Sequence, residues 1–136
     1  MIFRGTMGVP AQESLMFDHL GFTSADLDAS VRFYTAALQP LGHEITSRDE
    51  SSAGLGSAKG TALWIYAGGS KKSAKGVHIA FAAKDRETVD KFHRAGLAAG
   101  GRDNGAPGLR KDYSPTYYAA FLFDPDGNNV EAVCLK

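Results

Sequence analysis

Hydrophobic positions along the chain follow a strand period and then a helix period, and this succession occurs twice. Residues 17–23 alternate as a strand does, and apolar side chains then recur at helical spacing, at Leu27, Val31, Tyr34 and Leu38. The second succession has a strand at 76–83 and a helix whose buried side is Val89, Phe92 and Leu97. Each helix follows a capping side chain, Ser24 or Asp26 in the first case and Asp85 in the second.

Three shorter strands are expected after each helix. In the first half they are 43–48, 52–57 and 61–67, and in the second half they are a weak strand near Arg102, then 117–123 and 128–135. The last two are joined by Asp124-Pro125-Asp126-Gly127, in which proline presets the turn and glycine accepts a positive φ. Residues 104–116 contain Gly105, Pro107 and Gly108 and are expected to form a loop that acts as a lid. Both halves therefore predict the order β-α-β-β-β.

The two halves also match in sequence. HLGFTSADLDASVRFYTAAL, from His19, aligns with HIAFAAKDRETVDKFHRAGL, from His78, at an offset of 78 − 19 = 59 residues. We expect an α+β domain over 16–136, with module 1 at 16–70, a linker at 71–75 and module 2 at 76–136. Residues 1–15 lack an apolar block of signal-peptide length and are expected to be an N-terminal extension.

Charge and composition narrow the class of partner. The 136 residues include 15 Lys and Arg against 15 Asp and Glu, so no strong field favours nucleic acid or an anionic membrane. Apolar stretches such as 117–123 are far shorter than the ~20 residues of a membrane helix. A small-molecule partner is therefore expected. The single cysteine, Cys134, excludes an internal disulfide and suits the cytoplasm.

Strand parity gathers three possible metal ligands on one face. In each predicted strand the apolar residues face the helices, which leaves His19, His78 and Glu131 on the opposite face. Two imidazoles and a carboxylate are suitable donors for a divalent cation. A plainer interpretation is that each histidine is only a polar side chain at the start of a strand and that Glu131 is a solvated charge. Equivalent positions of the histidines in the repeat favour the metal site.

The motifs FDHLGF (17–22), GVHIAF (76–81) and FLFDPDGNNVEAVC (121–134) resemble those of the glyoxalase / bleomycin-resistance / extradiol-dioxygenase superfamily, also called vicinal oxygen chelate (VOC). The resemblance covers nearly all of 16–136. It implies paired βαβββ modules that form a cupped mixed sheet with helices on its outer face. It also implies one divalent metal ion (Fe²⁺, Mn²⁺, Zn²⁺ or Ni²⁺) on His19, His78 and Glu131, and a homodimer. Modules pair within one chain or swap between two, and the sequence leaves both arrangements open.

Departures from the family pattern bear on the activity. Similar glyoxalase I enzymes have a glutamate ligand where this chain has Trp64, which disfavours ordinary methylglyoxal-adduct isomerisation. The His, His, Glu set is similar to the ferrous site of extradiol dioxygenases and the manganese site of fosfomycin-resistance thiol transferases. Both groups tend to place a tyrosine ten residues before the carboxylate, where this chain has Phe121. Tyr117 has the same parity and is the candidate catalytic replacement, unless it only packs beside Trp64.

The candidate substrate-binding residues are Trp64, Tyr66 and Phe121, which would enclose an apolar group, and Arg110 with Tyr113 in the loop 104–116. Arg110 and the neighbouring Lys111 would contact an anionic group of the substrate. Solvated loop charge is the plainer interpretation of Arg110. The leading hypothesis is a metal-dependent enzyme with lyase, isomerase or dioxygenase-type chemistry on a small chelating substrate. The alternatives are a non-catalytic sequestration protein of the bleomycin-resistance type and a thiol transferase of the fosfomycin-resistance type.

Overall fold

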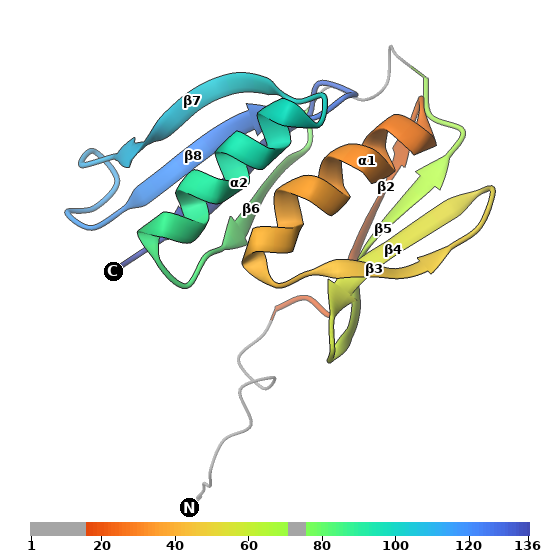
Figure 1. The fold of residues 1–136 in the computed structure, drawn as a ribbon, viewed down its shortest axis with the longest axis horizontal. Helices are drawn as coiled ribbons and strands as arrows, with labels where there is room; N and C mark the ends of the chain where they lie inside the picture. The colour runs from red at the N-terminus through yellow and green to blue at the C-terminus, as the bar shows by residue number, and fades with distance from the viewer. Residues whose placement is uncertain (1–15, 71–75) are drawn as a thin grey trace, which may run out of the picture.

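Two copies of the order strand, helix, strand, strand, strand make up the fold. The computed structural model describes residues 16–70 and 76–136, so the expected extension at 1–15 and linker at 71–75 lie outside the described residues. Module 1 comprises β2 (Leu20–Ser24), α1 (Leu27–Leu38), the short 3₁₀ helix η2 (Gln39–Leu41), β3 (Glu44–Arg48), β4 (Ser52–Ser57) and β5 (Gly60–Ala67). Module 2 comprises β6 (His78–Ala82), α2 (Arg86–Ala98), β7 (Arg102–Leu109), β8 (Tyr118–Phe123) and β9 (Asn129–Cys134) (Figure 1).

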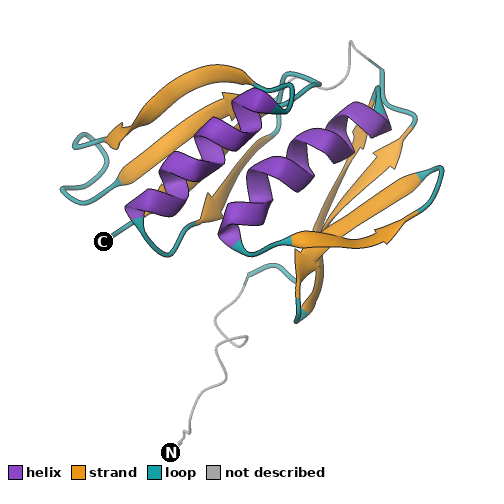
Figure 2. Ribbon diagram, in the orientation of Figure 1, coloured by secondary structure: helices purple, strands orange, loops and turns teal. Residues whose placement is uncertain are grey.

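Each module forms its own four-stranded mixed sheet. The strand orders are β2-β5-β4-β3 and β6-β9-β8-β7, with β2 parallel to β5, β6 parallel to β9, and the other neighbours antiparallel. The two helices lie side by side on the same side of the strands (Figure 2). The expected α+β class and the βαβββ order are therefore confirmed.

The helices cover an apolar core that both modules share. Phe33 and Tyr34 of α1 and Phe92 of α2 are fully buried. Leu97, expected on the buried side of α2, is instead 40% exposed, and Gly96 takes the inner position. A Cβ at Gly96 would lie 2.3 Å from Leu122 Cδ1 and 3.2 Å from Phe33 Cε1, so a glycine there permits the close approach of α2 to α1 and β8.

Both helix starts use the expected acidic caps. Asp26 accepts a hydrogen bond from the backbone N–H of Ala29 at 3.1 Å, and Asp85 accepts one from Thr88 at 2.8 Å. Each bond satisfies an amide that the helix itself leaves unpaired. The caps fix where the chain leaves β2 and β6, and hence which residues of these strands face away from the helices.

The expected loop at 104–116 is wrong over its first half. Residues up to Leu109 belong to β7, which pairs with β8 through two register shifts, between Asp103 and Gly105 and between Gly105 and Gly108. The strand lies at the edge of its sheet, where Pro107 costs no interior ladder bond. Only residues 110–117 form a loop, so the glycines expected to act as a lid hinge are strand residues.

The turn between β8 and β9 also connects the two modules. Asp126 accepts hydrogen bonds from the backbone N–H of Ala25 at 2.9 Å and from the Ser30 hydroxyl at 3.2 Å. Ala25 lies just before α1, and Ser30 lies in its first turn. The turn that delivers Glu131 on β9 is therefore held against module 1.

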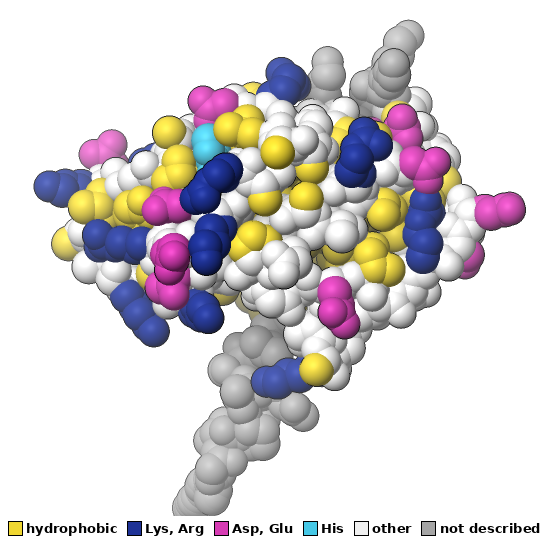
Figure 3. Space-filling view, in the orientation of Figure 1, with side chains coloured by type: hydrophobic (Ala, Val, Ile, Leu, Met, Phe, Trp, Pro, Cys, Tyr) yellow, Lys and Arg dark blue, Asp and Glu magenta, His cyan; other side chains and the backbone are white. Residues whose placement is uncertain are grey.

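The helical side of the molecule carries charges of both signs. Lys and Arg side chains alternate with Asp and Glu over the part of this face that contains α2 (Figure 3). This agrees with the zero net charge of the whole chain. Neither helix of the described residues is long and apolar enough to cross a bilayer.

Candidate functional site

Module 2 places several of the expected residues around one open cleft. The residues that line it are His78 of β6, Tyr113 and Tyr117 of the loop before β8, Phe121 of β8, and Asn129 and Glu131 of β9. The cleft has a volume of about 320 Å³. It lies on the side of the sheet away from α2, as strand parity predicts. We call this surface the module 2 face.

His78 and Glu131 are in direct contact on this face. The Nε2 atom of His78 lies 3.1 Å from Oε1 of Glu131. On the other side of the ring, Nδ1 lies 3.1 Å from the backbone carbonyl oxygen of Asn129. A carbonyl oxygen can only accept a hydrogen bond, so Nδ1 carries the proton in the neutral imidazole. The lone pair of Nε2 then points at the carboxylate.

This arrangement leaves two electron-pair donors facing one another. A neutral imidazole nitrogen and a carboxylate oxygen repel unless a cation, either a proton or a metal ion, lies with them. Two donors bound at about 2.1 Å to one ion, at roughly a right angle, lie about 3 Å apart. The separation of His78 and Glu131 fits that value, and the bond from Nδ1 to a backbone carbonyl is the usual support of a metal-binding histidine. The donor pair therefore suits a divalent ion.

Glu131 is held by a second side chain. Its carboxylate is buried, with 2% of the residue exposed, and its Oε2 accepts a hydrogen bond from the Tyr117 hydroxyl. Burial of the phenol and its bond to Glu131 raise the pKa of Tyr117 to about 12. The phenol therefore stays protonated at neutral pH and donates to Glu131. The interpretation of Glu131 as a solvated charge is wrong.

His19 lies apart from this pair. It precedes β2 in module 1, its side chain is 57% exposed, and its Nδ1 contacts the carboxylate of Asp18 at 2.8 Å. Among residues 16–70 and 76–136 of one chain, no three His, Cys, Asp or Glu side chains gather closely enough to hold an ion. The fold of a single chain thus brings together two of the three expected ligands.

The aromatic residues expected to bind substrate also divide between the modules. Trp64 and Tyr66 of β5 are stacked on the module 1 sheet, with ring centroids 6.4 Å apart and planes 15° from parallel. Glycines make room for them, because a Cβ at Gly21 would lie 3.1 Å from the Tyr66 ring and one at Gly54 would lie 3.0 Å from the Trp64 ring. We call these two rings the aromatic pair.

The loop residues expected to bind substrate lie on the module 2 side. The Tyr113 ring packs edge-on against Tyr117, with centroids 4.9 Å apart. The Arg110 guanidinium lies over the ring of Phe121, 5.3 Å from its centroid. Sequence reasoning missed Asn129, because its contribution to the site is a backbone carbonyl, which no side-chain pattern reveals.

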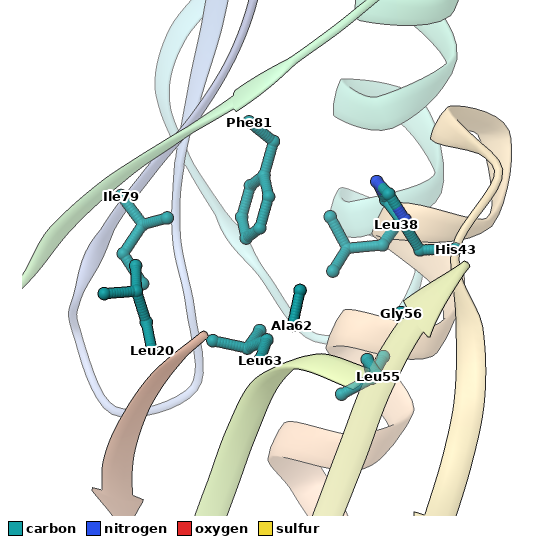
Figure 4. A pocket seen from close by; sticks show the side chains of 9 residues that line it. All are labelled: Leu20, Leu38, His43, Leu55, Gly56, Ala62, Leu63, Ile79 and Phe81. Carbon is teal, nitrogen blue, oxygen red and sulfur yellow. The ribbon is translucent and has the colours of Figure 1, made fainter. Parts of the chain in front are cut away.

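A second cavity lies between the modules and has a different character. It measures about 90 Å³ and is lined almost wholly by apolar side chains, among them Leu20, Leu63, Ile79 and Phe81 (Figure 4). The only ionisable residue that lines it is His43, and burial lowers the pKa of that imidazole. A single imidazole among apolar side chains does not provide the set of donors that a metal site requires. The candidate chemistry therefore belongs to the module 2 face.

Comparison with known proteins agrees with this architecture. A family model described as Glyoxalase/Bleomycin resistance protein/Dioxygenase superfamily matches residues 16–132. A crystal structure of a glyoxalase/bleomycin resistance protein from Albidiferax ferrireducens is 33% identical, with a TM-score of 0.74, over 88% of this chain and 99% of that one. No curated protein sequence matches the chain.

More distant structures show the same fold. A glyoxalase/bleomycin resistance protein/dioxygenase family enzyme from Burkholderia phytofirmans is 20% identical, with a TM-score of 0.66, over 88% of this chain and 98% of that one. A bleomycin resistance determinant encoded on transposon Tn5 is 22% identical, with a TM-score of 0.59, over 85% of this chain and 94% of that one.

Proposed function

Since this chain belongs to the glyoxalase/bleomycin resistance protein/dioxygenase superfamily, we propose that it is a metal-dependent enzyme acting on a small chelating substrate. One observation carries the proposal: the Nε2 atom of His78 lies 3.1 Å from the buried carboxylate of Glu131, while the Nδ1 atom of the same ring contacts a backbone carbonyl. The expected chemistry is of the lyase, isomerase or dioxygenase type. The ion is one of Fe²⁺, Mn²⁺, Zn²⁺ and Ni²⁺, all of which accept imidazole and carboxylate ligands.

The third ligand in this proposal is His19 of a second copy of the chain. Within one chain the exposed His19 does not join the other two ligands, and the aromatic pair lies on the same separate sheet. A homodimer in which module 1 of one copy faces module 2 of the other would unite all three. Such an interface is isologous, so each dimer would contain two equivalent sites.

A bound divalent ion would act as a Lewis acid that stabilises negative charge on the chelating oxygens of the substrate. The residues of the chain have separate tasks around it. Asn129 fixes the tautomer of His78, and Tyr117 orients the carboxylate of Glu131. The aromatic pair and Phe121 exclude water from the apolar part of the substrate. A catalytic role for Tyr117 as a proton donor stays a prediction, since its pKa of about 12 favours the positioning role at neutral pH.

Mixing two inactive variants tests both the ligand set and the sharing between chains. His19→Ala and Glu131→Gln should each abolish metal uptake, measured by elemental analysis after dialysis against Zn²⁺. Unfolding and refolding the two variants together should restore about a quarter of the wild-type metal content, because half of the dimers are hybrids with one intact site. Recovery of no metal in the mixture would refute the shared site. A wild-type chain that takes up none of the four ions would refute the enzyme proposal.

A non-catalytic binding protein is the second candidate, and the aromatic pair is the observation that favours it. Two stacked rings on an open sheet suit the capture of a flat apolar compound. Binding of an aromatic compound that survives His78→Ala without loss of affinity would support this candidate. The presence of the His78 and Glu131 pair favours the enzyme. A cytoplasmic location stays a prediction, in keeping with the free, buried Cys134.

A further inference from the structure

Arg110 is held in place beside the candidate site. Its Nη1 donates to the Gly108 carbonyl at 2.8 Å, and its Nη2 donates to the Ala106 carbonyl at 2.7 Å. Its backbone is also fixed, because its N–H donates to the Tyr117 carbonyl at 2.7 Å. An arginine that merely extends from a loop into water makes no such set of bonds. The guanidinium is therefore preorganised.

The surroundings of Phe121 connect Arg110 to the metal-binding pair. Phe121 of β8 pairs with Glu131 of β9 on one side and with Gly105 of β7 on the other. Arg110 directly follows β7, and His78 lies on β6, beyond β9. The His78 ring stacks on the Phe121 ring with centroids 6.5 Å apart, while the guanidinium lies 5.3 Å from the same ring. A Cβ at Gly105 would lie 3.0 Å from the Phe121 ring and 3.1 Å from Arg110 Nη2, so this glycine leaves space for both groups.

The charge of Arg110 has no counterion among the residues that the structure describes. Among residues 16–70 and 76–136, no carboxylate forms an ion pair with it, and its two hydrogen bonds go to neutral carbonyls. A guanidinium has five N–H groups in a planar fork, so several donors stay available for an oxygen anion. The centroid of the Phe121 ring lies 6.5 Å from that of the His78 ring and 5.3 Å from the guanidinium, so the imidazole and the fork are separated by about the width of one aromatic ring and its two contacts.

We propose that Arg110 determines specificity by binding an anionic oxygen group, such as a carboxylate, at the end of the substrate remote from the metal. The inference rests on the proposed metal-dependent function and adds a substrate class to it. The substrate would be a chelating compound that carries a second, negatively charged group about one aromatic ring away from the chelating oxygens. Phe121 would lie beneath the connecting part of the molecule.

Two hydroxamates of equal size test the proposal on the Zn²⁺-loaded full chain. 4-Carboxybenzohydroxamate and 4-carbamoylbenzohydroxamate chelate through the same atoms and differ in one charge. Calorimetric titration of the wild type should show about tenfold tighter binding of the carboxylate, the effect of one charge-assisted hydrogen-bond pair. Arg110→Gln should bring the ratio of the two dissociation constants close to one. Arg110→Lys should keep part of the preference.

Lys111→Gln is the matched control, since it removes the same charge from the neighbouring, exposed position and should keep the wild-type ratio. Equal binding of both probes by the wild type would overturn the role of Arg110 while leaving the metal site intact. A preference that persists in Arg110→Gln, or that Lys111→Gln also abolishes, would overturn it too. A wild-type chain that binds neither Zn²⁺ nor either hydroxamate would instead refute the proposed function, and this inference with it.

Discussion

Tyr34 of α1 donates a hydrogen bond of 2.5 Å to the carboxylate of Asp124, which directly follows β8 in the other module. Both residues are buried, and burial together with the charge of Asp124 raises the pKa of Tyr34. Asp124 also accepts bonds from the backbone amides of Asp126 and Asn128. One carboxylate thus shapes the turn before β9 and connects it to module 1, so the position of Glu131 depends on contacts between the modules.

The first prediction concerns this connection. Tyr34→Phe should lower the free energy of unfolding by about 1–3 kcal/mol, because the buried carboxylate loses a donor that no water replaces. Urea denaturation monitored by circular dichroism measures the change. Tyr118→Phe is the matched control, since Tyr118 donates to Asp90 at 2.6 Å in a partly exposed position and should lose less than about 1 kcal/mol. Equal losses in the two variants would contradict the proposed importance of burial.

Glu131→Gln should have opposite effects on the metal-free and the metal-loaded protein. The amide keeps an acceptor for Tyr117 and gains an N–H that can donate to the lone pair of His78 Nε2. It also removes a buried charge, so the metal-free variant should be as stable as the wild type or about 1 kcal/mol more stable. Added Zn²⁺ should raise the Tm of the wild type and leave that of the variant unchanged.

Glu87→Gln controls for the loss of one negative charge, because Glu87 lies on the exposed start of α2. It should respond to Zn²⁺ as the wild type does. Stabilisation of the Glu131→Gln protein by the ion would show that the carboxylate is not a ligand.

Tyr117→Phe should weaken metal binding while leaving the fold intact. Loss of the phenol frees the carboxylate of Glu131 to rotate, and loss of such a supporting bond costs about 10- to 100-fold in metal affinity. Competition with a chromogenic chelator measures the affinity. Tyr113→Phe is the matched control, because Tyr113 contacts Tyr117 through its ring alone and should keep wild-type affinity. Identical affinities in all three proteins would contradict the positioning role.

His43 should make the protein less stable at mildly acidic pH. Burial lowers the pKa of the folded imidazole below its ordinary value of 6.5. As the pH falls through about 6.5, the unfolded chain takes up a proton that the folded chain resists, so the free energy of unfolding falls. His43→Gln removes this proton uptake and should reduce the loss of Tm between about pH 7 and about pH 5.5. Parallel Tm profiles for variant and wild type would show that His43 does not contribute.

The sequence determines the local features of this protein. Strand and helix periods predict both βαβββ units, and Asp26 and Asp85 cap the helices because a cap needs only an oxygen and amides a few residues away. Parity places His78, Glu131 and Phe121 on one face, since alternation is a property of each strand by itself. The weak strand expected near Arg102 is the start of β7, but the continuation of β7 to Leu109 escaped prediction because Gly105, Pro107 and Gly108 lack any apolar pattern. Backbone pairing with β8, supplied from outside the segment, makes it a strand.

Only the tertiary structure decides which distant groups meet. It turns the backbone of Asn129 toward His78, places Tyr34 on Asp124 and sets Arg110 against Phe121. It also keeps His19 apart from the other two expected ligands within one chain. Parity along a strand is fixed by covalent geometry, whereas the distance between two strands depends on how sheets and helices pack, and no period of side chains records that packing.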